Sequence, residues 1–103
     1  MTQVPQKVST TVRVRVELFG MARLGSGCAL LDLDLPGDAT LAAVAQALVA
    51  ACPALRGLAV RADGTGLLES YRLNLNGRVF VTEAGVQLRP GDTLLLFSSQ
   101  AGG

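Results

Sequence analysis

Alternating apolar and polar side chains predict two strands near the start of the chain. In the first series the apolar residues alternate with Arg and Glu, and they are Val12, Val14, Val16 and Leu18. After a glycine-containing loop over residues 20–27 comes a second series, formed by Ala29, Leu31, Leu33 and Leu35. A period of two is that of a strand with one buried face. Two such strands on either side of a short loop indicate a hairpin.

A helical spacing of apolar residues follows, over about residues 40–51. The residues at this spacing are Leu41, Val44, Ala45, Leu48 and Cys52. Asp38 or Thr40 can accept hydrogen bonds from the free amides at the helix start, and Pro53 ends the helix because proline disfavours helical geometry at the preceding residue. The polar face lacks Lys and Arg, which favours a helix that covers a sheet over one that lies on a membrane.

A second hairpin is predicted over residues 71–82, after an irregular segment at 53–70. Asn76 and Gly77 are the pair that most readily forms a type I′ turn. A two-residue turn pairs Leu73 with Phe80 and leaves Val79 on the opposite face, unless a bulge changes the register.

The final predicted strand covers residues 93–97 and follows a Pro-Gly turn at 90–91. Its alternation directs Leu94 and Leu96 towards the core. Leu95 and Phe97 then face the other way. The chain therefore contains one main helix and several strands, which is the pattern of an α+β domain.

Composition supports a single compact domain. The chain has 103 residues, of which 50% are hydrophobic and 17% charged, values typical of a globular protein. We expect a flexible lead-in at residues 1–11, a folded domain at 12–97 and a flexible tail at 98–103. The lead-in has no secretory signal pattern and no apolar stretch is long enough to span a membrane, so a cytoplasmic protein is expected.

Charge and residue usage argue against several functions. Nine basic and eight acidic residues give a net charge of +1, which does not favour nucleic acid as a partner. The sequence contains no His, the commonest metal ligand and general base, and no metal site is expected. Asp32 and Asp34 are too few ligands for a metal and are interpreted as solvated charges on an open sheet face. Cys28 and Cys52 are interpreted as small apolar core residues, with a disulfide between them left open.

Apolar residues on outward faces are the strongest candidates for binding. If the first and last strands are neighbours, Phe19, Leu95 and Phe97 form one apolar surface, with Val79 beside it. Such a surface usually marks a partner site. The alternative is that dimerisation or the segment 53–70 covers these residues.

Four segments in order resemble the MoaD/ThiS family of ubiquitin-like sulfur carriers. They are residues 16–23 (VELFGMAR), 36–48, 73–81 (LNLNGRVFV) and 88–97 (LRPGDTLLLF), and the chain ends in Gly102 and Gly103 as the family does. The resemblance covers about residues 12–103 and implies the β-grasp fold, with a mixed sheet packed on one main helix and a flexible C-terminal tail. Ser98 and Ser99 stand where many molybdopterin-type carriers have two prolines.

The resemblance implies that the C-terminal carboxylate of Gly103 is the reactive group. An adenylyltransferase similar to the ubiquitin-activating enzymes would adenylate it with ATP, and a sulfur donor such as a cysteine desulfurase or rhodanese would supply sulfur for a thiocarboxylate. Gly102 and Gly103 have no Cβ, which lets this terminus enter a narrow channel. The chain itself would then be a carrier, not an enzyme, with no stably bound cofactor.

The best-studied family members deliver sulfur to a precursor of molybdopterin, as the small subunit of a synthase with a large partner subunit. Relatives serve thiazole, cysteine or tRNA thiolation. The residues expected to contact partners are Phe19, Val79, Leu95, Phe97, Ser98, Ser99, Gln100 and Ala101. Two alternatives remain open, namely a protein modifier joined to lysines through Gly103, and an interaction module whose glycines are incidental.

Overall fold

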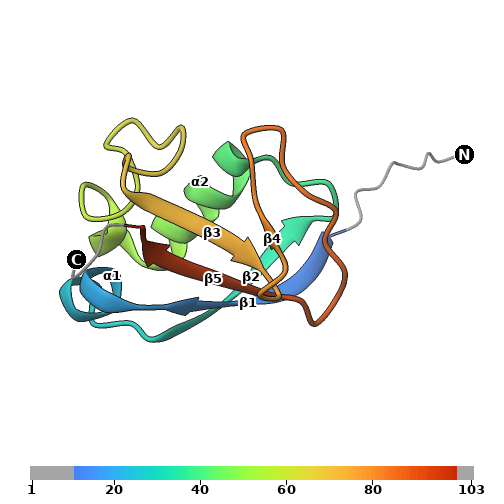
Figure 1. Cartoon of the computed structure of the whole chain (residues 1–103), viewed down its shortest axis with the longest axis horizontal. Coiled ribbons are helices and arrows are strands. Elements are labelled where there is room, and N and C mark those ends of the chain that lie inside the picture. The colour runs from blue at the N-terminus through green and yellow to red at the C-terminus, as the bar shows by residue number, and fades with distance from the viewer. Residues whose placement is uncertain (1–10, 100–103) are drawn as a thin grey trace, which may run out of the picture.

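The computed structural model describes residues 11–99, which form a five-stranded mixed sheet packed against helix α2 (Figure 1). The elements in chain order are β1 (Thr11–Leu18), α1 (Gly20–Ser26), β2 (Leu30–Pro36), α2 (Leu41–Ala51), the short 3₁₀ helix η1 (Pro53–Leu55), β3 (Tyr71–Leu75), β4 (Val79–Phe80) and β5 (Thr93–Ser98). The expectations for residues 1–10, and for Gln100, Ala101, Gly102 and Gly103, lie outside the described residues.

The strand order in the sheet is β2-β1-β5-β3-β4. β1 and β2 form the predicted antiparallel hairpin, with Val14 opposite Leu33. β5 runs parallel to β1 on one side and antiparallel to β3 on the other. The first and last strands are therefore neighbours in the middle of the sheet, and the predicted α+β β-grasp fold is confirmed.

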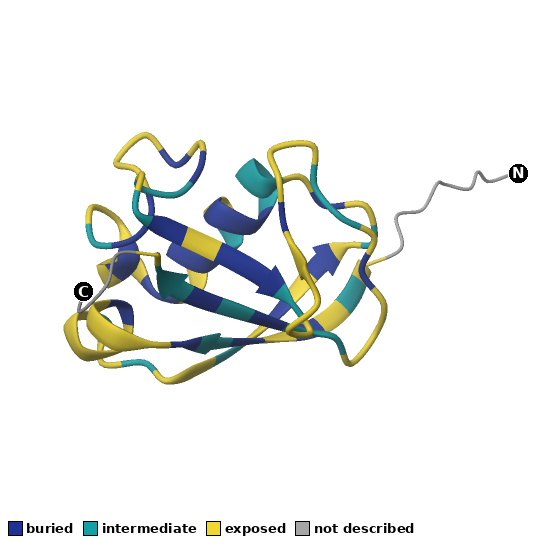
Figure 2. Ribbon diagram, viewed as in Figure 1, coloured by how far each residue is buried: buried dark blue, intermediate teal, exposed yellow. Residues whose placement is uncertain are grey.

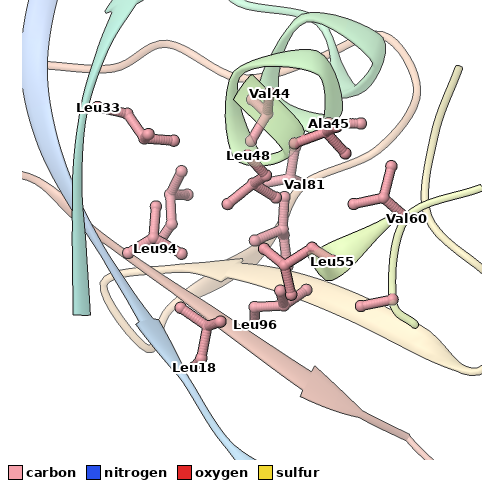
Figure 3. Close-up of a cluster of buried hydrophobic side chains, with 14 of the residues drawn as sticks. Leu18, Leu33, Val44, Ala45, Leu48, Leu55, Val60, Val81, Leu94 and Leu96 are labelled. Atoms are coloured by element: carbon pink, nitrogen blue, oxygen red, sulfur yellow. The ribbon is translucent and has the colours of Figure 1, made fainter. Parts of the chain in front are cut away.

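The core lies between the sheet and α2 (Figure 3). Inward side chains of β1, β3 and β5 meet Val44, Ala45 and Leu48 of α2, all of them buried. α2 begins at Leu41, and Thr40 is its N-cap, because the Thr40 hydroxyl accepts a 3.1 Å hydrogen bond from the Ala43 amide.

The segment 53–70 is irregular as predicted, yet it supplies part of the core. Its fully buried side chains are Leu55, Ala59 and Val60, and Figure 3 shows Leu55 and Val60 beside Leu48 and Leu96. This segment therefore fills one end of the core and does not cover the opposite face of the sheet.

One prediction in the first part of the chain is wrong. Residues 20–26 are the helix α1, where a loop was expected. Ala22 is buried beneath it, and Gly27 ends it in the left-handed conformation, with its amide bonded to the Arg23 carbonyl. Gly25 lies close to Leu58, and a Cβ there would lie 2.8 Å from the Leu58 Cδ2 atom, so a larger residue would require the Leu58 side chain to shift. The glycines that indicated a loop instead allow a short helix to pack closely and to end.

The second hairpin contains a bulge, the alternative that the sequence does not exclude. Asn76 and Gly77 both have positive φ, as a type I′ turn requires. However, Leu75 pairs with Val79 and Asn74 with Phe80, so Arg78 is an extra residue in the returning strand. The predicted pairing of Leu73 with Phe80 is therefore wrong by one residue, and the faces of Val79 and Phe80 are exchanged.

The two turn motifs of the sequence are joined to each other. The Asn76 amide group donates to the Asp92 carboxylate (3.0 Å), and the Asn76 side-chain oxygen accepts from the Thr93 amide (2.9 Å). The Asp92 carboxylate also accepts from the Arg89 amide at 2.8 Å. These bonds tie the β3–β4 turn to the start of β5, so both motifs have a structural role.

Candidate functional site

The candidate site is the outer face of the sheet, which is the face opposite α2. The strand registers place five residues in one row across all five strands. In strand order from β2 to β4, these are Leu30, Glu17, Leu95, Asn74 and Phe80. Paired residues of adjacent strands share a face, so side chains from four distant parts of the sequence meet here.

Aromatic rings stand beside this row. Phe97 follows Leu95 on the outer face of β5, and its ring centroid lies 6.2 Å from that of Phe80. Phe19 has extended backbone angles and donates its amide to the Leu96 carbonyl, so it continues the alternation of β1 and lies next to Phe97. We call Phe19, Leu30, Phe80, Leu95 and Phe97 the outer apolar patch.

The outer apolar patch is accessible to solvent in the structure of residues 11–99. Phe19 is 42% exposed and Phe80 57% exposed, whereas Leu95 and Phe97 are half-buried. Figure 2 shows the corresponding exposed and intermediate segments on β5 and around α1. The sequence expectation that Phe19, Leu95 and Phe97 share one surface is therefore confirmed in its geometry, and the segment 53–70 does not cover it.

Val79 does not belong to this patch. It is 46% exposed, but it pairs with Leu75, whose other neighbour is the buried Leu94. This pairing places Val79 on the core-side face at the sheet edge. Phe80 takes the expected position because of the bulge at Arg78.

The other half of the outer face is charged and internally paired. The Arg13 guanidinium lies 3.1 Å from the Asp34 carboxylate, and that of Arg15 lies 3.4 Å from Asp32. Exposed pairs of this kind contribute less than about 1 kcal/mol each. Within residues 11–99 no three His, Cys, Asp or Glu side chains gather as metal ligands would.

β5 ends next to the outer apolar patch. Ser98 is the last residue of β5, and the Ser99 amide donates to the Ser70 carbonyl at 2.6 Å. The Ser99 hydroxyl donates to the same carbonyl at 3.0 Å. The expectation of a flexible tail from residue 98 is therefore wrong for these two serines. A proline at position 99 would have no amide hydrogen for this contact.

The two cysteines lie side by side as free thiols. Their sulfur atoms are 3.2 Å apart, with Cys52 buried at the end of α2 and Cys28 half-buried before β2. Both pack with the core, which confirms their interpretation as small apolar residues. The hydrogen bond with Cys52, together with desolvation, raises the pKa of the Cys28 thiol above its usual value.

Replacement of Cys52 by alanine is expected to lower the pKa of Cys28, because the thiol loses that hydrogen bond. A lower pKa gives more thiolate at a given pH, so the midpoint of the pH profile for alkylation of Cys28 by iodoacetamide moves to lower pH. Ser26→Ala is the matched control with the opposite sign, because the Ser26 hydroxyl lowers this pKa. Equal midpoints in wild type and Cys52→Ala would contradict the assignment.

No family model and no curated protein matches the sequence. Solved structures do match. SAMP1 from Haloferax volcanii, small archaeal modifier protein 1, aligns with 31% sequence identity and a TM-score of 0.72 over 88% of this chain and 99% of that one. The chain belongs to the MoaD/ThiS family of ubiquitin-like proteins.

Two further structures of MoaD/ThiS-like proteins share the fold. A putative molybdopterin converting factor, subunit 1, from Pyrococcus furiosus has 20% identity and a TM-score of 0.64, over 86% of this chain and 99% of that one. Urm1 from Trypanosoma brucei has 22% identity and a TM-score of 0.64, over 93% of this chain and 100% of that one.

Membership of the MoaD/ThiS family gives the general function. The chain is a sulfur carrier or modifier of the MoaD, SAMP and Urm1 kind, and small carriers of the SAMP and MoaD kind are not catalytic. The family implies an activating partner similar to the ubiquitin-activating enzymes. None of the helices within residues 11–99 has the length and apolar character needed to cross a membrane.

Proposed function

We propose that this chain carries sulfur as a thiocarboxylate on Gly103 and donates it in the biosynthesis of molybdopterin, the organic part of the molybdenum cofactor. The fold-wide match to SAMP1 at 31% identity carries the general function of a carrier or modifier. The printed name of another fold match, a putative molybdopterin converting factor subunit 1, is what suggests molybdopterin as the pathway. The outer apolar patch, next to the end of β5, is the proposed surface for the activating enzyme and for a large synthase subunit.

The proposed chemistry takes place beyond the described residues. The Gly103 carboxylate attacks the α-phosphate of ATP on the activating enzyme, and pyrophosphate leaves. The outer sulfur of a cysteine persulfide on a cysteine desulfurase or a rhodanese then attacks the acyl carbon and displaces AMP. A second thiol cleaves the resulting acyl disulfide, which releases the thiocarboxylate and leaves a disulfide on the donor side. The carrier contributes the carboxylate and the docking face, whereas the partner supplies the nucleotide site. No cofactor has to stay bound to the carrier.

Geometry supports this division of roles. β5 is held on both sides by hydrogen-bonded strands, and Ser99 is fixed on Ser70. Four residues follow Ser99, and an extended segment of that length spans at most about 14 Å. A partner that binds the outer apolar patch must therefore place its nucleotide within this distance of Ser99.

Intact mass spectrometry tests the proposal. The full chain is incubated with a candidate activating enzyme, ATP and a sulfur source, and is expected to gain the mass difference between sulfur and oxygen. Omission of ATP removes the gain. Addition of a large synthase subunit and the molybdopterin precursor is expected to reverse it as molybdopterin forms. Absence of any gain with every candidate enzyme would contradict the carrier function, and a gain that this acceptor does not reverse would contradict the molybdopterin pathway.

A protein modifier is the second candidate, and the match to a small archaeal modifier protein favours it. In this case the activated Gly103 forms an isopeptide bond with a lysine of a target protein. Peptide mass spectrometry of cell extract, searched for the C-terminal residues of this chain on lysine side chains, distinguishes the two functions. Adducts without thiocarboxylate would favour the modifier.

A further inference from the structure

Two hydrogen-bond acceptors in the middle of the outer face have no partner among residues 11–99. They are the side-chain oxygen of Asn74 and the carboxylate of Glu17. The strand registers place both residues directly beside Leu95, one on each side. The two backbone positions are thus two strand spacings apart, about 10 Å.

Asn74 is the more unusual of the two. It is only 9% exposed, and it is the one buried polar residue within residues 11–99. Its row neighbours are Leu95 and Phe80, which offer no polar atom from their side chains. An amide oxygen that has lost water and gained no donor destabilises the folded chain. A leucine at this position would avoid that cost, so the amide is unfavourable for the free protein.

Glu17 breaks the charge pattern of β1. The two other charged residues on this face of β1, Arg13 and Arg15, each have an aspartate opposite them on β2. Glu17 has Leu30 there instead, and Leu95 on its other side. Arg72 lies on the same face, but its guanidinium donates to the backbone carbonyls of Glu69 and Tyr71. The half-buried Glu17 carboxylate therefore gives the apolar half of the face an uncompensated negative charge.

We propose that the protein partner of the outer apolar patch places one arginine side chain over Leu95. There it donates to Glu17 and to the Asn74 oxygen, which is enclosed in the free chain and which the unpartnered amide turns outward when the partner binds. Both groups of the carrier accept hydrogen bonds, and one is negative, so the complementary group is a cation with several donors. Arginine fits better than lysine, because its planar guanidinium presents five N–H donors in a fixed fork. Desolvated arginines in apolar surroundings are also frequent hot spots of protein interfaces.

The inference rests on the proposed function, because the partner meant is the activating enzyme. The probe is therefore a candidate activating enzyme from the same cells, titrated with the full-length carrier in the absence of ATP. Glu17→Gln removes the charge, and Asn74→Leu removes the amide while it adds apolar area. Asp34→Asn is the matched control, because it removes a negative charge from the same face at its paired end.

Each of the two variants is expected to weaken binding at least tenfold, and Glu17→Gln also reduces the dependence of Kd on salt. Asp34→Asn is expected to stay within twofold of wild type. The double variant loses less than the product of the two single losses, because both groups share one arginine. Asn74→Leu is also expected to raise the unfolding midpoint of the free carrier, so that stability and binding change in opposite directions.

Phe97→Asp separates this inference from the proposed function. If Phe97→Asp abolishes binding while Glu17→Gln and Asn74→Leu bind like wild type, the arginine contact is wrong and the docking face is right. Tighter binding by Asn74→Leu would overturn the inference directly. If the wild-type carrier binds no activating enzyme, or if Phe97→Asp changes nothing, the docking face proposed for this partner is itself wrong, and the inference fails with it.

Discussion

Deletion of Gly103 is expected to abolish thiocarboxylate formation completely while the folded domain stays intact. The shortened chain would end in the carboxylate of Gly102, one residue or about 3.5 Å short of the position at which the full chain meets the nucleotide. The core lies within residues 11–99, and its last fully buried side chain is Leu96. The unfolding midpoint is therefore expected to equal that of the full-length protein.

Intact mass after incubation with activating enzyme, ATP and a sulfur source is the measurement. Binding to the activating enzyme without ATP is the internal control, because the outer apolar patch is unchanged in the deletion variant. Glu83→Gln, an exposed loop substitution, controls for handling of the variants and should gain sulfur normally. Sulfur found on the deletion variant would mean that Gly103 is not the reactive residue.

Leu96→Ala is expected to cause a large loss of stability. Leu96 is fully buried, and its strand lies between β1 and β3 in the centre of the sheet. Truncation of a buried leucine removes its contacts and leaves a cavity, which costs about 2–5 kcal/mol in free energy of unfolding. A domain of this size has only about 5–15 kcal/mol in total, so the variant should be partly unfolded at moderate urea concentrations.

Urea unfolding, followed by circular dichroism, measures this loss. Leu24→Ala is the matched control, because Leu24 is 75% exposed on α1 and the same atoms are removed. Its free energy of unfolding should stay within about 0.5 kcal/mol of wild type. Similar losses in the two variants would mean that Leu96 is not packed as the structure has it.

Strand periodicity predicted most of the sheet because it reports burial directly. The series from Val12 to Leu18 and from Leu31 to Leu35 have one buried face each, and both are strands of the first hairpin. The helix α1 was not predicted, because seven residues are too few for a clear helical period and three of the residues from 20 to 26 are Gly or Ser. The close approach of Gly25 to Leu58, distant in sequence, is a feature of that helix that no local pattern reveals.

The outer apolar patch was predicted in part for a similar reason. Phe19, Leu95 and Phe97 follow from alternation within single strands. Leu30 and Phe80 were not predicted. Leu30 shares its face with Asp32, a signal that alternation offers. Phe80 has no such signal, because one bulge residue, Arg78, reverses the faces of the short strand β4. The burial of Asn74 depends on Phe80 and Leu95 together, which no local pattern reveals.

The position of β5 has a consequence for how the protein is made. Within residues 11–99, β5 is the last strand along the sequence but the central one in the sheet, and it alone joins the β1–β2 hairpin to the β3–β4 hairpin. While residues 93–98 are still inside the ribosome, the two hairpins have no hydrogen-bonded connection. The sheet can therefore close only after β5 has emerged. Chains that stop before residue 93 would expose unpaired strand edges, which mark them for aggregation or removal.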